Sequence, residues 1–246
     1  MFFNFSIFFS SLAFLFGLEL IAFQNNYLVL LTAFISLFTM YTAHRIGQKF
    51  LSGITPLVFT FSSIALLYLV DSALQQQWLI VLSTSVYYLA FLGIYRLRYY
   101  ERDKTAHGIM AFVTMATSFL FYSSFYGIYL NFAIPIGVFM LTYCLVTMVL
   151  SYQYFIVLDA KEIRRAKIYS LLLGLAMAEI AWIVNFWPFG YLTTGVVVLM
   201  FYYLLWYMIQ SYFLQALSQK HIFMQLALFS LLIGMVLTST RWVPIA

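Results

Sequence analysis

Charge is scarce in this sequence of 246 residues: Asp, Glu, Lys and Arg together make up only 8% of it, and 65% is hydrophobic. Soluble domains carry about 25% charged residues, so this composition cannot cover a folded surface in water. The mean hydropathy of +0.98 indicates that much of the surface faces lipid. The net charge of +5 does not indicate a nucleic-acid partner, because the basic residues stand in short clusters beside apolar runs.

Cysteine and known catalytic motifs are also missing. The single cysteine, Cys144, excludes an intramolecular disulfide and a multi-cysteine metal site, and its apolar surroundings are typical of a small packing residue. There is no P-loop, no G-x-S-x-G and no H-E-x-x-H. The aspartate-rich motifs of membrane prenyltransferases, the double-aspartate pattern of phosphatidyl-alcohol transferases and the serine–histidine pair of rhomboid proteases are absent as well. These absences weigh against an enzyme without excluding one, and we predict no cofactor and no metal.

What the sequence has in abundance is long apolar runs, most of them near the roughly 20 residues that cross about 30 Å of hydrocarbon. Runs such as LLYLV do not alternate polar and apolar residues, which disfavours a β-barrel. The first run lacks a basic leader and is followed at once by another, so we expect a membrane helix there and not a cleaved signal peptide. Residues 1–246 are predicted to form one all-α integral membrane domain, a bundle of about nine transmembrane helices at 2–23, 27–43, 54–70, 77–95, 107–129, 133–158, 168–187, 192–213 and 222–239.

The basic residues fall in alternate loops between these spans. Short connections on the other side predict antiparallel hairpins. By the positive-inside rule the basic side is cytoplasmic, so we expect the N-terminus inside, the C-terminus outside and a multi-pass location in a bacterial cytoplasmic membrane. The basic loops are expected to meet the anionic headgroups of membrane lipids. Eleven of the twelve basic residues share that side: Arg45, Lys49, Arg96, Arg98, Arg102, Lys104, Lys161, Arg164, Arg165, Lys167 and Lys220.

Stripes of small or polar residues at steps of three and four predict the faces on which helices pack, because close approach drives association in lipid. The stripe of the seventh span is Ser170, Gly174, Ala178, Ala181 and Asn185. The first span has Ser6, Ser10, Ala13 and Gly17, and the sixth has Tyr143, Thr147 and Ser151.

Glu179 is the leading candidate site residue. It stands about 16–17 Å along the seventh span, near the middle of the membrane, where an acid must be protonated, paired or in contact with a wet cavity. One interpretation is a proton or cation site or a ligand anchor, and the other is a neutral acid bonded to a neighbouring helix. With residues of similar depth it is predicted to line an outer pocket, in which Arg241 could pair with either acid: Glu179, Asn185, Trp182, Glu19 and Arg241.

A second candidate is a cluster at the cytoplasmic face. Histidine, carboxylate and arginine side chains gathered there could act on a lipid-linked substrate or hold phosphate. The alternative is that they are solvated charges and interfacial histidines, and no two histidines have ligand spacing along one helix. The predicted members are His44, His107, Asp103, Asp159, Glu162 and Arg164.

The run AEIAWIVNFWPFGY, the aromatic helix after it and the terminal STRW resemble uncharacterised polytopic membrane proteins of small-genome bacteria. The resemblance covers about the last third of the chain and implies no activity. The function predicted from the residues is a non-enzymatic binding, transport or membrane-complex role that depends on Glu179, with a protein partner in the membrane as one possibility. The alternatives are a membrane enzyme that uses the cytoplasmic-face cluster and a structural subunit of a membrane complex.

Overall fold

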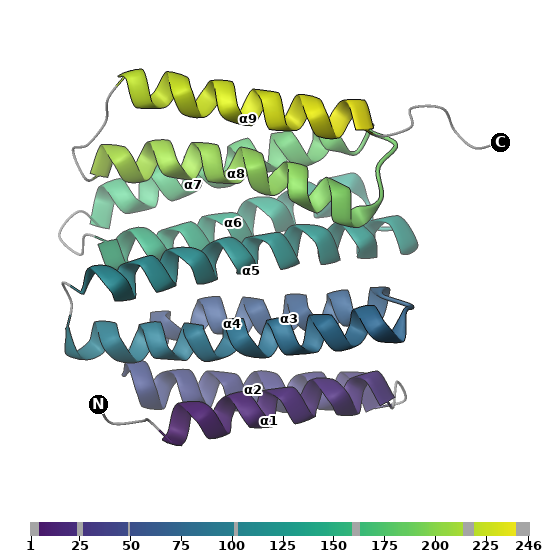
Figure 1. Ribbon diagram of the computed structural model, residues 1–246, viewed down its shortest axis with the longest axis vertical. Helices are drawn as coiled ribbons and strands as arrows, with labels where there is room; N and C mark the ends of the chain where they lie inside the picture. The colour runs from purple at the N-terminus through teal and green to yellow at the C-terminus, as the bar shows by residue number, and fades with distance from the viewer. Residues whose placement is uncertain are drawn as a thin grey trace. The chain divides into compact units, whose positions relative to one another are not determined.

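The computed structural model shows helices throughout the part of the chain that it describes, which is residues 5–23, 27–48, 50–100, 103–158, 163–213 and 219–239. Eight of these helices are long and apolar enough to cross a membrane, which confirms an all-helical, multi-pass membrane protein. The helices are α1 (Phe5–Phe23), α2 (Leu28–Gly47), α3 (Ile54–Leu69), α4 (Ala73–Tyr99), α5 (Lys104–Asn131), α6 (Ile136–Leu158), α7 (Ile163–Val184), α8 (Tyr191–Phe213) and α9 (Gln219–Ser239), with a short 3-10 turn, η2 (Phe50–Gly53), before α3 (Figure 1).

Several boundaries differ from the predicted ones for identifiable reasons. α4 and α5 are longer than 77–95 and 107–129, because their backbone hydrogen bonds continue past the apolar run into polar flanks. α3 is short, and η2 extends its apolar stretch to Leu51–Leu69. α7 ends at Val184 and not at residue 187, since a turn follows in which the Asn185 amide donates to Ala181 and the Trp187 amide to Val184. α9 carries a shorter apolar run, Phe223–Thr238.

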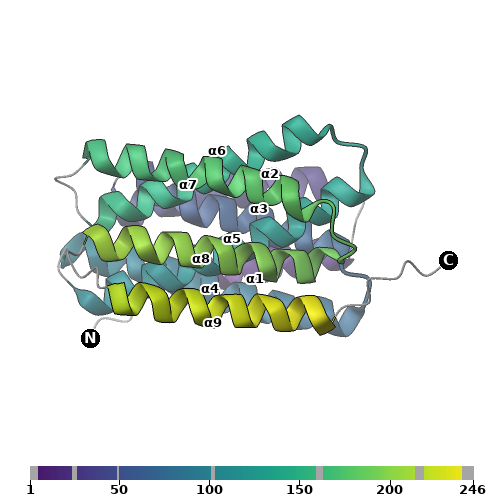
Figure 2. The same cartoon turned by 90° about the horizontal axis from the view of Figure 1, so that it is seen from above.

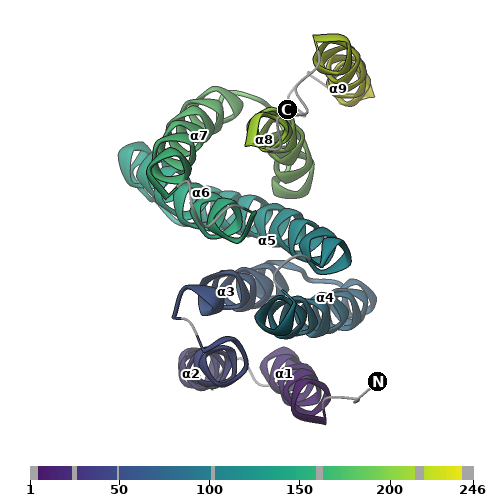
Figure 3. The ribbon, with the colours of Figure 1, turned by 90° about the vertical axis from the view of Figure 1, so that its left-hand side faces the viewer.

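The chain divides into two compact units, Met1–Ile128 and Tyr129–Ala246, and each is described by itself. In the first unit, α1 lies beside α4 and α2 beside α3, so that four helices pack around one core (Figure 3). Phe14 and Phe59 are fully buried there, and the Phe14 ring stacks on Tyr87 at 4.1 Å between centroids and 2° between planes. α5 joins α4 near their connection, where Gly93 leaves room for Met110.

In the second unit, α6 and α7 form the most closely packed hairpin, and α8 and α9 follow side by side (Figure 2). The stripe predicted on the seventh span is confirmed as a packing face at Ser170, Gly174, Ala178 and Ala181, which are buried, whereas its last member, Asn185, is half-buried in the turn after α7. At Gly174 the α6 backbone comes so close that a methyl group would lie 2.6 Å from the Cys144 carbonyl oxygen. The predicted α6 stripe, Tyr143, Thr147 and Ser151, is also buried.

The basic residues of the first unit that the structure describes gather at one end of its helices. They lie at the C-terminal ends of α2 and α4 and at the N-terminal end of α5: Arg45, Arg96, Arg98 and Lys104. The acids Glu19 and Asp71 lie toward the other end, where Glu19 accepts a hydrogen bond from Gln77 of the first turns of α4. The helices of this unit therefore alternate in direction, as the hairpin prediction requires.

Candidate functional site

Glu179 lies on a face of α7 that the second unit leaves exposed. Large apolar residues recur on that side at steps of three and four: Leu172, Leu175 and Trp182 on α7, and Phe186 in the turn that follows it. We call these four residues and Glu179 the Glu179 face. Trp182 is 47% exposed and its ring meets Phe186 edge-on at 5.5 Å. The packing stripe of α7 occupies a different side of the helix, so α6 does not cover Glu179.

The surroundings of Glu179 are apolar and offer it nothing to bond. Within the described residues, no hydrogen bond or ion pair reaches its carboxylate. It stands twelve residues beyond Lys167, or about 18 Å at 1.5 Å per residue, and five residues, or about 7.5 Å, before the end of α7. Placing an acid at such depth costs about 2.5–3.5 kcal/mol on insertion scales. An acid at this position must be protonated, contact water or pair with a polar group from outside α6 and α7.

Of the predicted outer pocket, Trp182 lies on the same side of α7 as Glu179, and the rest of the pocket stays a prediction. Asn185 is half-buried in the turn after α7. Glu19 belongs to the first compact unit, where Gln77 Nε2 donates to its carboxylate at 3.2 Å. Arg241 lies outside the described residues, so the Glu19–Arg241 and Glu179–Arg241 pairs stay predictions.

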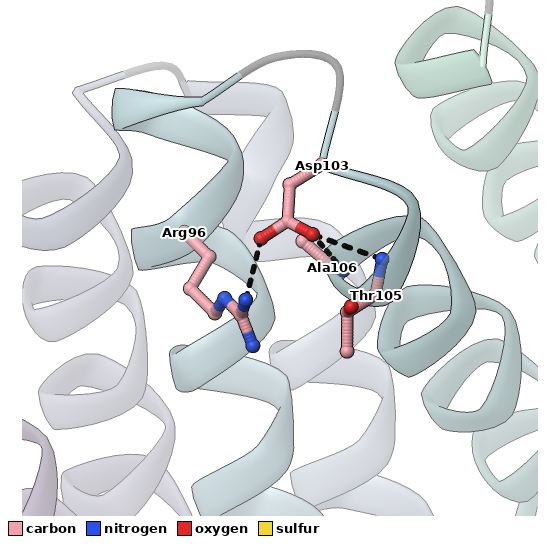
Figure 4. A network of polar contacts seen from close by, with 4 residues as sticks. All are labelled: Arg96, Asp103, Thr105 and Ala106. Carbon is pink, nitrogen blue, oxygen red and sulfur yellow. Dashed lines mark hydrogen bonds and ion pairs between the residues drawn. The ribbon is translucent and has the colours of Figure 1, made fainter.

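The best-defined polar cluster is at the basic end of the first unit, around Asp103 (Figure 4). Its carboxylate accepts hydrogen bonds from the amides of Thr105 at 2.9 Å and Ala106 at 3.4 Å, which makes it the N-cap of α5. Arg96 of α4 reaches the same carboxylate at 2.7 Å. Partial burial works to raise the pKa of Asp103, but the two amides and the Arg96 guanidinium outweigh it and hold the pKa below its ordinary value.

Arg98 secures a second helix end beside this cluster. Its guanidinium donates to the carbonyl oxygens of Ile46 at 2.9 Å and Arg45 at 3.5 Å, at the C-terminus of α2. These are carbonyls without helical partners, and a cation is favoured at the negative end of the helix dipole. Asp103 and Arg98 thus fix the ends of α5 and α2 against α4, which gives Asp103, a member of the predicted cytoplasmic-face cluster, a structural role.

Whether the remaining members of that cluster meet Asp103 in one site stays a prediction. His44 is exposed in the last turn of α2, and His107 is half-buried in the first turn of α5. Arg164 is exposed at the start of α7, in the second unit. Asp159 and Glu162 lie outside the described residues. In the described part of the chain, no three His, Cys, Asp or Glu side chains come together as metal ligands.

Sequence reasoning did not find the buried hydroxyl cluster of the first unit. Thr39 of α2 lies 3.3 Å from Thr60 of α3 and 3.0 Å from the Tyr87 hydroxyl of α4, oxygen to oxygen. All three side chains are fully buried. The signal in the sequence was threonine and tyrosine inside apolar runs. These residues are too common in membrane helices to show that three of them, far apart in the sequence, meet in the fold.

No curated protein and no solved structure matches this chain. One family model does match, over residues 26–239, which takes in α2 to α9 and leaves α1 outside. That family is described as proteins of unknown function. The resemblance stated from the sequence likewise implied no activity. The narrower resemblance to proteins of small-genome bacteria stays a prediction. The match covers most of the sequence, and the chain therefore belongs to DUF5656, a family of proteins of unknown function.

Proposed function

We propose that this protein is a non-enzymatic component of a membrane complex, and that the Glu179 face binds a helix of another membrane protein. The observation that carries the proposal is the exposed acid at the centre of an apolar helix face. Apolar residues alone would be satisfied by lipid tails. An acid among them is not, because acids at this depth are almost always paired or turned toward a polar interior.

The spacing of the Glu179 face fits a helical partner. Residues 172, 175, 179 and 182 follow the alternating three and four steps by which helices interlock their side chains, and Phe186 stands four residues further on, in the turn after α7. A polar residue at one such position selects partner and register, because only a complementary group satisfies it. The partner helix is therefore expected to carry a basic, amide or hydroxyl side chain opposite Glu179.

The rival functions find less support. A carrier needs polar groups that lead from Glu179 toward both membrane surfaces, whereas its neighbours on the same face are Leu172, Leu175, Trp182 and Phe186. An enzyme at the cytoplasmic face needs acids, bases or nucleophiles that converge, whereas Asp103 is occupied by Arg96 and the α5 amides.

The orientation is part of the same proposal. We take α9 as a ninth span, with the N-terminus in the cytoplasm, the C-terminus outside, and the protein in the cytoplasmic membrane of a bacterium. The support is the collection of Arg45, Arg96, Arg98 and Lys104 at one end of the first unit, where the positive-inside rule expects cytoplasm.

Site-specific photo-crosslinking in intact membranes tests the proposal. A photoreactive amino acid is placed at Leu175 or Trp182, which flank Glu179 on its exposed face, and the products are identified by mass spectrometry. The matched control position is Leu141, on an exposed apolar face of α6 that has no acid. We expect one discrete protein adduct at each of the first two positions and lipid adducts alone at the control.

Replacement of the acid then links the adduct to Glu179. Glu179→Leu should reduce the adduct about tenfold or more, since it removes a charge-assisted hydrogen bond, and Glu179→Gln should retain part of it. Equal thermal stability of the variants in detergent verifies that the fold is intact. Lipid adducts alone at all positions, an adduct unchanged by Glu179→Leu, or an adduct to a second copy of this chain would each overturn the proposed partner.

A further inference from the structure

A groove of about 480 Å³ runs between α1 and α2 in the first unit. This size is within the range of small-molecule pockets, about 300–1,000 Å³. Three aromatic rings, one alanine and three small hydroxyl side chains form its walls, and a single charged side chain stands among them. The lining residues are Ser6, Phe9, Ser10, Ala13, Phe38, Tyr41, Thr42 and Arg45.

The groove exists because α1 and α2 meet closely at one point and not along their whole length. At Gly17 a methyl group would lie 2.6 Å from Ile35 Cδ1, so the two helices are in tight contact there. Toward the N-terminus of α1 the predicted packing stripe is only partly covered: Ser10 is buried, Ser6 is half-buried and Ala13 is exposed. This corrects the prediction that the whole stripe is a packing face. The small side chains leave space beside Phe38 and Tyr41.

The walls suit a hydrocarbon chain. The hydroxyls of Ser10 and Thr42 already donate to carbonyl oxygens of their own helices, to Ser6 at 2.7 Å and to Phe38 at 2.8 Å. Neither hydroxyl therefore has a hydrogen left to donate to a ligand. Phe9, Ala13, Phe38 and the ring of Tyr41 offer apolar contact.

The charged end suits an anion. Arg45 is exposed in the last turn of α2, and among the described residues no acid pairs with it. The Arg98 guanidinium bonds the Arg45 carbonyl oxygen and adds a second positive charge at the same helix end. The groove thus has apolar walls and, at the end of the unit where its described basic residues lie, the unpaired cation Arg45.

We infer that this groove binds one anionic phospholipid, with the headgroup phosphate at Arg45 and an acyl chain along α1 and α2. From Arg45 to Phe38 is seven residues, or about 10 Å along α2. The lining does not extend past Ala13 and Phe38, and the tight contact of Gly17 with Ile35 follows beyond them. Polybasic helix ends attract anionic lipids at about 1 kcal/mol per basic residue. The inference is independent of the proposed function, since it concerns α1 and α2 and not the Glu179 face.

Native mass spectrometry of the full-length protein in mild detergent tests it. Phosphatidylglycerol and phosphatidylcholine with identical acyl chains are titrated against four proteins. These are the parent, Arg45→Gln, Ala13→Phe and Arg164→Gln. Ala13→Phe fills the groove from an exposed position, and Arg164→Gln removes an exposed basic residue of the second unit as a matched control.

We expect the parent to prefer phosphatidylglycerol, and Arg45→Gln to weaken it about tenfold, the effect of one lost charge-assisted hydrogen bond. Ala13→Phe should weaken binding of both lipids, and Arg164→Gln should leave the preference unchanged. Unaltered thermal stability of each variant shows that the fold persists. The inference fails if Arg45→Gln binds phosphatidylglycerol like the parent, if Arg164→Gln loses it equally, or if inorganic phosphate displaces the lipid completely.

Discussion

Gly174→Ala probes the contact on which the α6–α7 hairpin depends. A methyl group there would lie 2.6 Å from the Cys144 carbonyl oxygen, whereas ordinary contacts begin at 3.4 Å, so the helices must separate by about 0.8 Å. A gap of about 0.5–1 Å forfeits roughly a quarter to a half of the dispersion energy of each contact. Overpacking costs about 1–3 kcal/mol, and we expect the upper part of that range because the obstacle is helix backbone.

Alanine favours a helix over glycine by about 1 kcal/mol, so the net loss in the free energy of unfolding should be about 1–2 kcal/mol. Gly108→Ala in α5 is the matched control, because a methyl group there has no neighbour within 4 Å. It should gain up to about 1 kcal/mol. The two variants should therefore differ by about 2–3 kcal/mol, or roughly 30- to 150-fold in the unfolding equilibrium constant.

The measurement is equilibrium unfolding of the purified variants in mixed micelles, followed by tryptophan fluorescence as denaturing detergent is added. The parent, Gly174→Ala and Gly108→Ala are compared at one temperature. If Gly174→Ala proves as stable as Gly108→Ala, the close approach of α7 to the α6 backbone is wrong. The stripe from Ser170 to Ala181 would then lose its role as the packing face.

Three further outcomes follow from the first unit. The parent should lose stability at acid pH as Asp103 is protonated, and Asp103→Asn should not show this loss. The folded-state pKa of Asp103 lies below its ordinary value of 3.8. The stability that the ionised carboxylate contributes is therefore complete above pH 3.8 and disappears as pH falls through the lower, folded-state pKa. Parallel pH profiles of unfolding for parent and variant would contradict this. Tyr87→Phe should cost about 0.6–1.5 kcal/mol of unfolding free energy, because it loses the hydroxyl contact with Thr39 but keeps the ring, and an unchanged unfolding midpoint would refute it. A reporter active only outside the cytoplasm should be active when fused after residue 72 and inactive after residue 100; the opposite result would invert the proposed orientation.

Much of the fold follows from the sequence because lipid accepts any apolar side chain but offers no hydrogen bonds to the backbone. Each long apolar run must close its own hydrogen bonds, so it becomes a helix wherever it lies. Loop length then makes neighbours antiparallel, and small residues such as Gly174 predict where the helices touch. The errors were at helix ends, as at Val184, where a turn and not hydropathy decides the boundary.

The candidate sites were less predictable, since they depend on which side of a helix its neighbours cover. Glu179 was recognised from depth alone, but the sequence left open whether it turned inward to a pocket or outward. Asp103 was expected in a possible catalytic cluster, whereas it caps α5 and pairs with Arg96. The groove at Arg45 was not foreseen, because the Ser6–Gly17 stripe was read as fully packed.

By itself the sequence determined the lipid-facing, helical class of the protein, because this depends on the composition and length of single segments. Tertiary structure decided that α1 lies beside α4, that Tyr87 meets Thr39, and that Glu179 faces away from α6. The physical reason is that every membrane helix is apolar on nearly all sides. Periodicity therefore says little about which face is covered, and only the packing of distant segments settles it.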